Sequence, residues 1–307
     1  MTTHQAPDTQ TLTSPNSPTP TPTPTPTPPA VQDIWRYPVK SMAGERLDRC
    51  ELTTDGIAGD RCWAVRDEKR GCVTDARSLP ALLDIGVRYL RPPVPGEPSP
   101  PVELSAPGTP PVTSADAGVH DALSAHLGAD VTLWPRVPAD QREHYTRVYP
   151  EDVNGYLTGL FGVADLADIP DLSQLPPAVM EFQTIPGSYF DAYPLHILTT
   201  GILEALRAAL GSPVDTRRLR PNLVVDGPAE TDEDWTGREL RIGEATVRIE
   251  VACPRCVMIS RPQQGLAVDR ELLRTVHRRF GHNLGYYASV VKPGRVRSGD
   301  AVEPVAG

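Results

Sequence analysis

The sequence predicts a β-dominated α+β fold in two parts, and three observations lead to this prediction. Short runs of alternating apolar and polar residues recur through the first half, separated by turns that carry Gly and Asp; this spacing is typical of barrels and curled sheets. The second half combines further strands with two clear helix patterns. A Pro- and Gly-bearing stretch at 170–190 joins the halves. We therefore expect one domain at 31–165 packed against another at 166–307.

The N-terminal 30 residues differ from the rest of the chain. They are polar and become a Thr-Pro repeat, and proline removes backbone donors and favours extended polyproline geometry. Because such a segment cannot bury a core, we expect a disordered tail over residues 1–30. A docking site for a proline-binding partner is the functional alternative.

The first part should consist mainly of short strands. The alternating runs lie at 33–37, 49–52, 61–65, 72–74, 85–90 and 131–134. A short helical turn is expected at 78–83 and the first clear helix at 115–127, whereas the proline-rich stretch 92–111 predicts a long surface loop. Residues 136–190 look irregular apart from a short helix near 153–160.

The second part has sharper signals. Residues 195–198 predict a strand, and Thr199 or Thr200 can cap a helix that ends at Gly211. The remaining expected elements are strands at 223–225, 239–242 and 246–251, a helix at 269–280, and a closing hairpin built from 287–291, 293–296 and 299–302.

Composition excludes several classes of function. The formal net charge of -9 argues against nucleic-acid binding, which needs a basic footprint. No apolar run approaches the roughly 20 residues of a membrane span, and the chain shows no secretory start. Five cysteines, an odd number in a chain of this size, suit free thiols in a reducing, cytoplasmic compartment.

The sequence Cys253-Pro254-Arg255-Cys256 follows an alternating run at 245–251. A neighbouring cation favours the reactive thiolate, and three interpretations of the pair stay open. A structural zinc site needs about four ligands, usually two such pairs, and there is only one pair here. A redox dithiol should open a helix, whereas 257–259 looks like strand or loop before Pro262. The third interpretation is a thiolate ligand for another soft metal.

Two further motifs carry cations. Residues 217–222, Arg-Arg-Leu-Arg-Pro-Asn, stand just before a strand, and guanidinium groups bind oxyanions bidentately. In the first part, Lys40, Ser41 and Arg61 could converge on a second anion-binding face. For each motif the alternative is a solvated basic turn or strand end.

Together these motifs resemble those of the MOSC-domain proteins, named for the C-terminus of molybdenum cofactor sulfurase. The resemblance is strongest to the branch with an N-terminal β-barrel, which includes the mitochondrial amidoxime-reducing component. Six family-like elements occur in order: YPVKS at 37–41, GIAGDRCW at 56–63, DAYPLHIL at 191–198, RRLRPN at 217–222, CPRC at 253–256 and PGRVRSGD at 293–300. The resemblance implies an N-terminal MOSC β-barrel domain packed against a C-terminal MOSC β-barrel domain, with molybdenum cofactor in the cleft between them.

The resemblance also implies a set of site residues. Cys256 would be the molybdenum ligand, with Cys253 as a thiol behind it. The residues expected to contact the pterin and phosphate of the cofactor are Lys40, Ser41, Arg61, Arg220, Asn222 and, as further contacts, Asp191 and Tyr193.

By the same resemblance, the protein is expected to be a molybdenum-dependent oxidoreductase. It would reduce small N-hydroxylated compounds by oxo transfer. Residues 259–263, Ile-Ser-Arg-Pro-Gln, stand where relatives often have TTVDP, so the substrate range should differ. The chain carries no cysteine set for an iron–sulfur cluster. Electrons are therefore expected from a separate ferredoxin- or flavoprotein-type partner.

Three other functions stay open. The first is a non-catalytic carrier of the cofactor, or of sulfur as a Cys256 persulfide. The second is a dithiol oxidoreductase that uses both Cys253 and Cys256. Distant relatives bind pyridoxal phosphate, but no lysine here is singled out for a Schiff base, and Lys40 is expected to contact phosphate.

Overall fold

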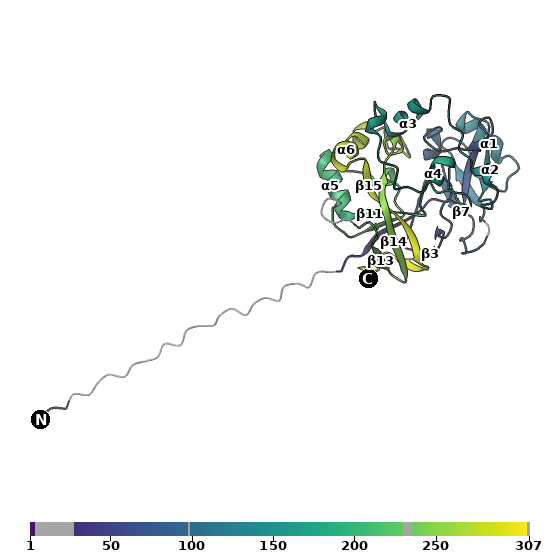
Figure 1. Ribbon diagram of the computed structural model, residues 1–307. Coiled ribbons are helices and arrows are strands. Elements are labelled where there is room, and N and C mark those ends of the chain that lie inside the picture. The colour runs from purple at the N-terminus through teal and green to yellow at the C-terminus, as the bar shows by residue number, and fades with distance from the viewer. Residues whose placement is uncertain (4–27, 98, 230–234, 306–307) are drawn as a thin grey trace.

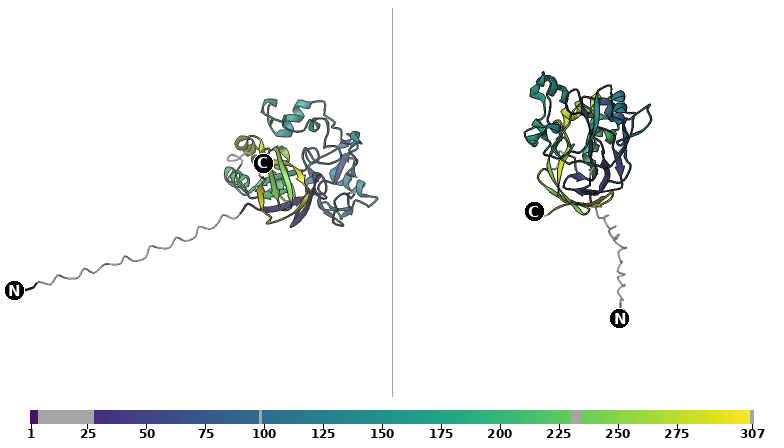
Figure 2. Two further views of the ribbon diagram at one scale, coloured as in Figure 1. Left: turned by 60° about the horizontal axis from the view of Figure 1, so that its bottom comes forward. Right: turned by 90° about the vertical axis from the view of Figure 1, so that its right-hand side faces the viewer.

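The computed structural model describes residues 1–3, 28–97, 99–229 and 235–305, so most of the predicted Thr-Pro tail lies outside the described residues. The N-terminal part (blue) and the C-terminal part (green to yellow) lie side by side, and the teal segment around α3 crosses above them (Figures 1 and 2). The fold is β-dominated, as predicted.

An eight-stranded sheet forms the C-terminal part, in the order β17-β13-β14-β15-β11-β12-β1-β2. Its strands are β1 (Val31–Arg36), β2 (Glu45–Leu47), β11 (Leu195–Thr199), β12 (Leu223–Val225), β13 (Glu239–Ile242), β14 (Ala245–Pro254), β15 (Asn283–Lys292) and β17 (Val302–Pro304). All neighbours are antiparallel except β11 and β12, which α5 (Thr200–Leu210) connects as a parallel pair. A second long helix, α6 (Arg270–Phe280), lies between β14 and β15 in the chain.

Both long helices begin and end as their sequences predict. Thr199 Oγ1 accepts a hydrogen bond from the Ile202 amide at 3.1 Å, and Gly211 ends α5 with φ 67°. A side-chain oxygen at the first position satisfies an otherwise unpaired amide, and glycine adopts the left-handed C-terminal conformation without steric cost. Asp269 caps α6 in the same way, through the Leu272 amide at 3.0 Å.

Three smaller sheets complete the strand pairing, in the orders β10-β5-β6, β16-β3-β4 and β7-β8-β9. Their strands are β3 (Arg49–Thr53), β4 (Gly56–Ile57), β5 (Trp63–Asp67), β6 (Cys72–Val73), β7 (Gly86–Tyr89), β8 (Val102–Ser105), β9 (Val112–Thr113), β10 (Val131–Pro135) and β16 (Gly294–Arg297). The other helices are η1 (Pro80–Asp84), α1 (Val119–Leu127), α2 (Arg142–Tyr145), α3 (Val153–Phe161), η2 (Leu166–Asp168), α4 (Ala178–Glu181), η3 (Thr216–Arg218) and η4 (Val257–Ser260). Among the described residues these sheets are open rather than closed barrels.

Three local predictions were wrong. The expected closing hairpin does not form: β15 pairs with β14 and β11, β16 with β3, and β17 with β13. The stretch 92–111, predicted to be a loop, contains β8, whose Val102 and Leu104 are buried. The residues after Cys256 form η4, a short 3₁₀ helix, rather than strand or loop.

The two parts of the chain interlock. Val31 and Ile34 of β1 belong to the core of the eight-stranded sheet, together with Leu52 and Ile57 from the next strands. A separate core fills the N-terminal part around Val65, Leu82, Leu104 and Leu133, among others. Because β1 pairs with β12, the turn after β1 is brought next to the segment that precedes β12.

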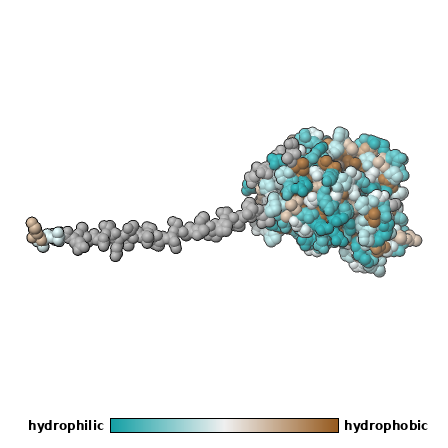
Figure 3. All heavy atoms as spheres, turned by 90° about the horizontal axis from the view of Figure 1, so that it is seen from below, coloured by the Kyte–Doolittle hydropathy of each residue, from teal (hydrophilic) through white to brown (hydrophobic). Residues whose placement is uncertain are grey.

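The surface carries both hydrophilic and hydrophobic residues. On the face in Figure 3, hydrophilic residues predominate and hydrophobic ones form small patches. In the part of the chain that the structure describes, no helix combines the length and the apolar character needed to cross a bilayer.

Candidate functional site

Segments from both parts of the chain meet at one cleft, which encloses about 710 Å³ including its solvent-open mouth. They are the turns after β1 and β4, the segments before β11 and β12, and the end of β14. Eight of the nine predicted site residues line the cleft: Lys40, Ser41, Arg61, Asp191, Tyr193, Arg220, Asn222 and Cys256. The ninth, Cys253, lies behind the wall and is only 1% exposed.

The two cysteines of the Cys-Pro-Arg-Cys turn have different surroundings. Burial raises the pKa of the Cys253 thiol, and the Arg255 guanidinium, which donates from Nη1 to Cys253 Sγ at 3.1 Å, only partly opposes this. Cys256 is half-buried and lines the cleft at the start of η4. Only the second cysteine is therefore placed to meet a ligand in the cleft.

Arg255 connects this turn to β11 and to the segment before β12. Its Nη2 donates to the Leu219 carbonyl at 2.7 Å, and its Nη1 lies 3.4 Å from His196 Nε2. Burial, helped by the Arg255 charge, lowers the pKa of His196 to about 3. His196 is thus a neutral ring in the cleft wall, with Nδ1 3.4 Å from the Arg220 carbonyl and Nε2 3.1 Å from the Leu284 carbonyl; its single N–H donates to one of the two.

Two guanidinium groups lie over the ring of one buried tyrosine. The Arg220 and Arg61 guanidinium carbons are 4.2 and 5.0 Å from the Tyr37 ring centroid, and cations lying over an aromatic face are attracted to it. Burial lowers the pKa of Arg220 to about 10, which reflects the cost of holding this charge away from water. The hydroxyl of Tyr37 donates to the Pro221 carbonyl at 3.0 Å. This bond links the tyrosine ring and the two guanidinium groups over it to the segment before β12.

Asp60 balances part of this charge. Its carboxylate forms an ion pair with Arg61 and accepts hydrogen bonds from the Tyr37 amide at 2.6 Å and from Asn222 Nδ2 at 3.0 Å. The Asn222 side chain oxygen in turn accepts from the His196 amide at 3.1 Å. Asn222 therefore lines the cleft mainly as a support for Asp60 and the strand entrance, since its polar atoms are already engaged by the protein.

Three of the cleft residues have left-handed backbone conformations. Positive φ values occur at Ser41 (65°), Arg61 (48°) and Arg220 (53°). Side chains at such positions are uncommon, and the strain persists only where the surrounding structure imposes it. Ser41 is fixed further because its hydroxyl oxygen accepts from the Ala76 amide at 3.0 Å.

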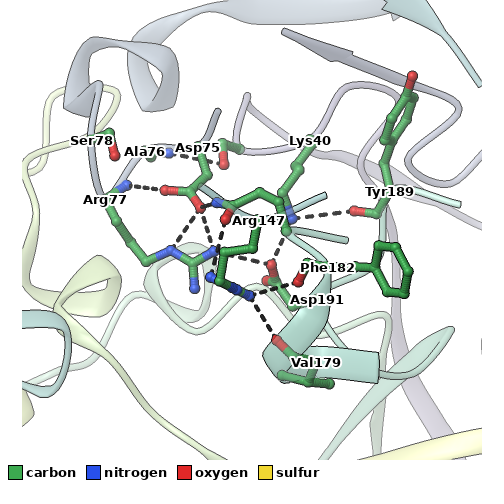
Figure 4. A network of polar contacts seen from close by, with 12 residues as sticks. Lys40, Asp75, Ala76, Arg77, Ser78, Arg147, Val179, Phe182, Tyr189 and Asp191 are labelled. Atoms are coloured by element: carbon green, nitrogen blue, oxygen red, sulfur yellow. Dashed lines mark hydrogen bonds and ion pairs between the residues drawn. The ribbon is translucent and has the colours of Figure 1, made fainter. Parts of the chain in front are cut away.

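Lys40 is buried and, like Arg77, forms an ion pair with the carboxylate of Asp191 (Figure 4). The Lys40 amine donates to Asp191 Oδ1 at 2.6 Å and to the Tyr189 carbonyl at 3.3 Å. Burial lowers the pKa of Lys40, and the neighbouring Asp191 charge only partly offsets this. Burial would raise the pKa of Asp191, but Lys40 and Arg77 outweigh it and hold that pKa below its usual range.

The arginines of the Arg-Arg-Leu-Arg motif have three different roles. Arg217 pairs with Asp215, and Arg218 donates to the carbonyls of Arg261, at 3.0 Å, and of Ala267. Arg220 alone of the three carries a buried nitrogen, Nη2, without a hydrogen-bond partner among the described residues. The residue types of the motif did not distinguish the three guanidinium groups, whereas the family resemblance named Arg220 as the expected contact.

Sequence reasoning missed the supporting roles of Tyr37, Asp60 and His196. All three belong to the quoted motifs, but an aspartate next to an arginine on a turn is ordinarily an exposed pair. Here the Asp60 side chain is fully buried. The only sequence signal for this was that Asp60 and Arg61 lie between two short apolar strands.

The donor set of the cleft suits an anionic ligand that carries a soft metal. A buried donor without an acceptor costs about 1–3 kcal/mol, and an oxyanion at Arg220 Nη2 would offset that cost. The Cys256 thiol supplies the soft donor that molybdenum accepts. Among the described residues, no group of three or more His, Cys, Asp or Glu is placed to hold a metal ion.

Comparison with protein families gives two matches. Residues 185–303 match the MOSC domain, and residues 29–137 match the MOSC N-terminal beta barrel domain. The segment 138–184 lies between the two matched regions.

Individual relatives agree with these matches. The chain is 26% identical over 293 residues to mitochondrial amidoxime reducing component 2 of Rattus norvegicus, covering 89% of this chain and 82% of that protein. It is 24% identical over 307 residues to mitochondrial amidoxime-reducing component 1 of Homo sapiens, with the same coverage. Among solved structures, the YUAD protein of Bacillus subtilis matches with a TM-score of 0.43 and 11% identity, over 91% of this chain and 96% of that one.

Proposed function

The chain belongs to the MOSC-domain proteins, and we propose that it binds molybdenum cofactor and reduces N-hydroxylated compounds. The observation that carries the proposal is the arrangement of the cleft: a half-buried Cys256 lines the same cavity as Lys40, Arg61 and Arg220, and Arg220 Nη2 is buried without a hydrogen-bond partner among the described residues. The names of the relatives, which describe amidoxime reduction, supply the substrate class.

In this proposal each cleft residue has a stated task. Cys256 binds the metal, while Arg220, Arg61, Lys40 and Ser41 contact the anionic part of the cofactor. When bound, this cofactor supplies two-electron oxo-transfer chemistry, and the protein supplies placement and charge.

The remaining residues position these groups. Asn222 and Asp60 orient Arg61, and Asp191 and Tyr193 border the space in which the substrate head would lie. The depressed pKa of Asp191 keeps this carboxylate ionised near neutral pH, so it can accept a hydrogen bond from an N-hydroxyl group. Solvent at the open mouth of the cleft supplies the protons.

We further propose a domain division, a source of electrons and a compartment. The chain divides into domains at 31–165 and 166–307, with β1 reaching into the sheet of the second. Electrons come from a separate redox protein of the ferredoxin or flavoprotein type. The five free cysteines suit a reducing, cytoplasmic compartment.

The test is metal and pterin content together with turnover. Protein purified from a host that makes molybdenum cofactor should hold about one molybdenum per chain and reduce benzamidoxime with reduced methyl viologen as donor. Cys256→Ala should lose the metal and at least 100-fold of the turnover, because the metal then has no protein ligand. Cys253→Ser, the matched control, should keep most of both, since Cys253 lies behind the wall.

Other outcomes separate the alternatives. Stoichiometric cofactor without any N–O reduction would identify a carrier. Equal damage from both cysteine substitutions would identify a dithiol mechanism. Zinc, or neither metal nor pterin, in properly expressed protein would refute cofactor binding.

A further inference from the structure

A second cavity adjoins the cleft at Cys256. It encloses about 680 Å³, including solvent at its mouth, and shares four lining residues with the cleft: Asp191, Pro254, Cys256 and Tyr287. Anything bound in it would therefore lie directly beside the residue that we propose as the metal ligand.

The walls of this cavity are apolar away from Cys256. Apart from Arg147, these walls come from the segment before α3, from α3, from the segment that follows it and from α4, and consist of Tyr149, Tyr156, Leu157, Leu160, Phe161, Leu172, Leu175, Val179 and Met180. Tyr149 and Tyr156 meet edge to face, with ring centroids 6.1 Å apart. We refer to this space as the apolar cavity.

The apolar walls belong to the part of the chain that neither family match covers. All nine residues lie within 138–184, between the matched regions 29–137 and 185–303. The connecting segment thus supplies the apolar walls of the cavity, and the two matched regions supply its polar end.

Hydrogen bonds from Arg147, which we call the Arg147 clamp, tie parts of the connecting segment to one another. Arg147 Nη2 donates to the carbonyls of Val179 at 3.0 Å and Phe182 at 2.9 Å, contacts that Figure 4 shows. Its Nη1 donates to Gln183 Oε1 at 3.0 Å and lies 3.3 Å from the Tyr156 hydroxyl. Because these bonds join α3 to α4, the cavity is preformed rather than created by a ligand.

The Arg147 clamp is linked to the polar end of the cavity through Gln183. Gln183 Nε2 donates to Asp75 Oδ2 at 2.8 Å, and Asp75 pairs with Arg77, which in turn reaches Asp191 at 3.4 Å. Arg77 and Asp191 line the apolar cavity next to Cys256. The space therefore has one charged, hydrogen-bonding end and one apolar end.

We propose that the apolar cavity binds the aromatic or alkyl body of the substrate, while the N-hydroxylated head lies between Cys256 and Asp191. The inference rests on the proposed function for the nature of the head, but the binding of the body depends only on the cavity. The substrates are amphipathic: a compact polar N–O group joined to an apolar body that the nine wall residues remove from water. Small polar N-hydroxylated compounds without such a body bind weakly.

The test compares acetamidoxime with octanamidoxime, which share a head and differ in the length of the chain. Binding to the full-length protein is measured by isothermal titration calorimetry without electron donor, so that no turnover occurs. Octanamidoxime should bind at least about tenfold more tightly, since each buried methylene adds to affinity. Leu160→Trp, which fills the cavity, should remove about tenfold of that affinity and leave acetamidoxime binding unchanged.

Two further variants keep the test decisive. Leu166→Trp, on the same segment but outside the cavity lining, is the matched control and should change neither ligand. If Leu160→Trp fails to fold, Leu172→Gln makes the wall polar at similar volume and should weaken octanamidoxime selectively. Equal affinity of the two amidoximes, or equal effects of Leu160→Trp and Leu166→Trp, would overturn the inference.

This outcome is distinguishable from failure of the proposed function. Protein without molybdenum or turnover that still prefers octanamidoxime would refute the reductase and retain the apolar cavity as a binding site. Protein that holds molybdenum and reduces both amidoximes, with no preference in binding, would retain the reductase and refute the role of the cavity.

Discussion

The two cavities that meet at Cys256 are built on opposite physical principles. The cleft is walled by buried charges, each held by specific partners such as the Asp60 carboxylate and the Tyr37 ring. The apolar cavity is walled mainly by half-buried side chains of α3, α4 and the chain around them, which need only be apolar and of suitable size. Charged walls tolerate few substitutions because an unpaired buried charge is costly, whereas apolar walls tolerate many of similar volume. This difference predicts where mutations should be severe.

The largest effect on stability should come from Asp60. Replacing it in the Asp60→Asn variant leaves the Arg61 guanidinium buried without its counter-charge, which should lower the free energy of unfolding by about 3 kcal/mol. Urea denaturation of the full-length protein measures this. The control is Asp55→Asn, which removes an exposed pair with Arg136 and should cost less than about 1 kcal/mol. Similar losses in the two variants would mean that removing a charge from the cleft costs no more stability than removing one from the surface.

The next effect is a pH dependence that originates in His196. Its pKa is about 3 in the folded protein and about 6.5 when unfolded, so below pH 6.5 the unfolded chain gains a proton that the folded one refuses. Stability is therefore fully present above pH 6.5 and falls on acidification, by about 2.5 kcal/mol between pH 6.5 and 4.5 from this group. This part of the slope should be absent from a folded His196→Gln variant and should appear in full in the difference between wild type and that variant. An unchanged slope in that variant would assign it to other groups, such as His277, whose pKa is also lowered, to about 4.

Arg220 should affect ligand binding more than folding. In the Arg220→Met variant the cleft loses the guanidinium whose Nη2 has no hydrogen-bond partner in the described part of the chain, so retention of cofactor should fall about tenfold or more. Stability should change by no more than about 1 kcal/mol, because removing a desolvated charge compensates for the lost bond to the Met42 carbonyl. Arg217→Met, in the same motif but paired with Asp215, should retain cofactor normally. Dialysis followed by pterin quantification compares the two.

The smallest effect is expected on the apolar side. Tyr149→Phe removes the hydrogen bond from its hydroxyl to the Met180 carbonyl, 2.8 Å and exposed, and should lower the free energy of unfolding by about 0.5–1 kcal/mol. Thermal denaturation should therefore show only a small shift in Tm. A loss as large as that of Asp60→Asn would contradict the contrast between the two walls.

The parts of the fold that sequence predicted are those with local causes. The caps of α5 and α6 depend on residues such as Thr199 and Gly211, which act within one turn of the helix. The predicted closing hairpin failed because β16 pairs with β3 through Arg295 and Glu51, residues far apart in the chain. Such pairing depends on tertiary packing that an alternating pattern does not specify.

The candidate site also has parts that could be predicted from the sequence and parts that could not. The resemblance of short motifs to those of MOSC-domain proteins implied eight of the residues that line the cleft. For the cations and Cys256, oxyanion and thiolate chemistry pointed the same way. The roles of Asp60 and His196 could not be predicted, because they follow from burial. The apolar cavity was missed altogether, because its leucines look like an irregular stretch until α3 and α4 are clamped by Arg147.

The Arg147 clamp has a consequence for how such a protein could diversify. It fastens a connecting segment, outside both family matches, to the cleft through the Gln183–Asp75 contact. The segment also contacts η4 through α3. We therefore expect that it can be exchanged without rebuilding the charged cleft where Arg147, Gln183 and this contact are kept. Grafting segments of different length and bulk between these points is a direct route to altered substrate preference, and natural variation in this family need not touch the cysteine turn to achieve the same result.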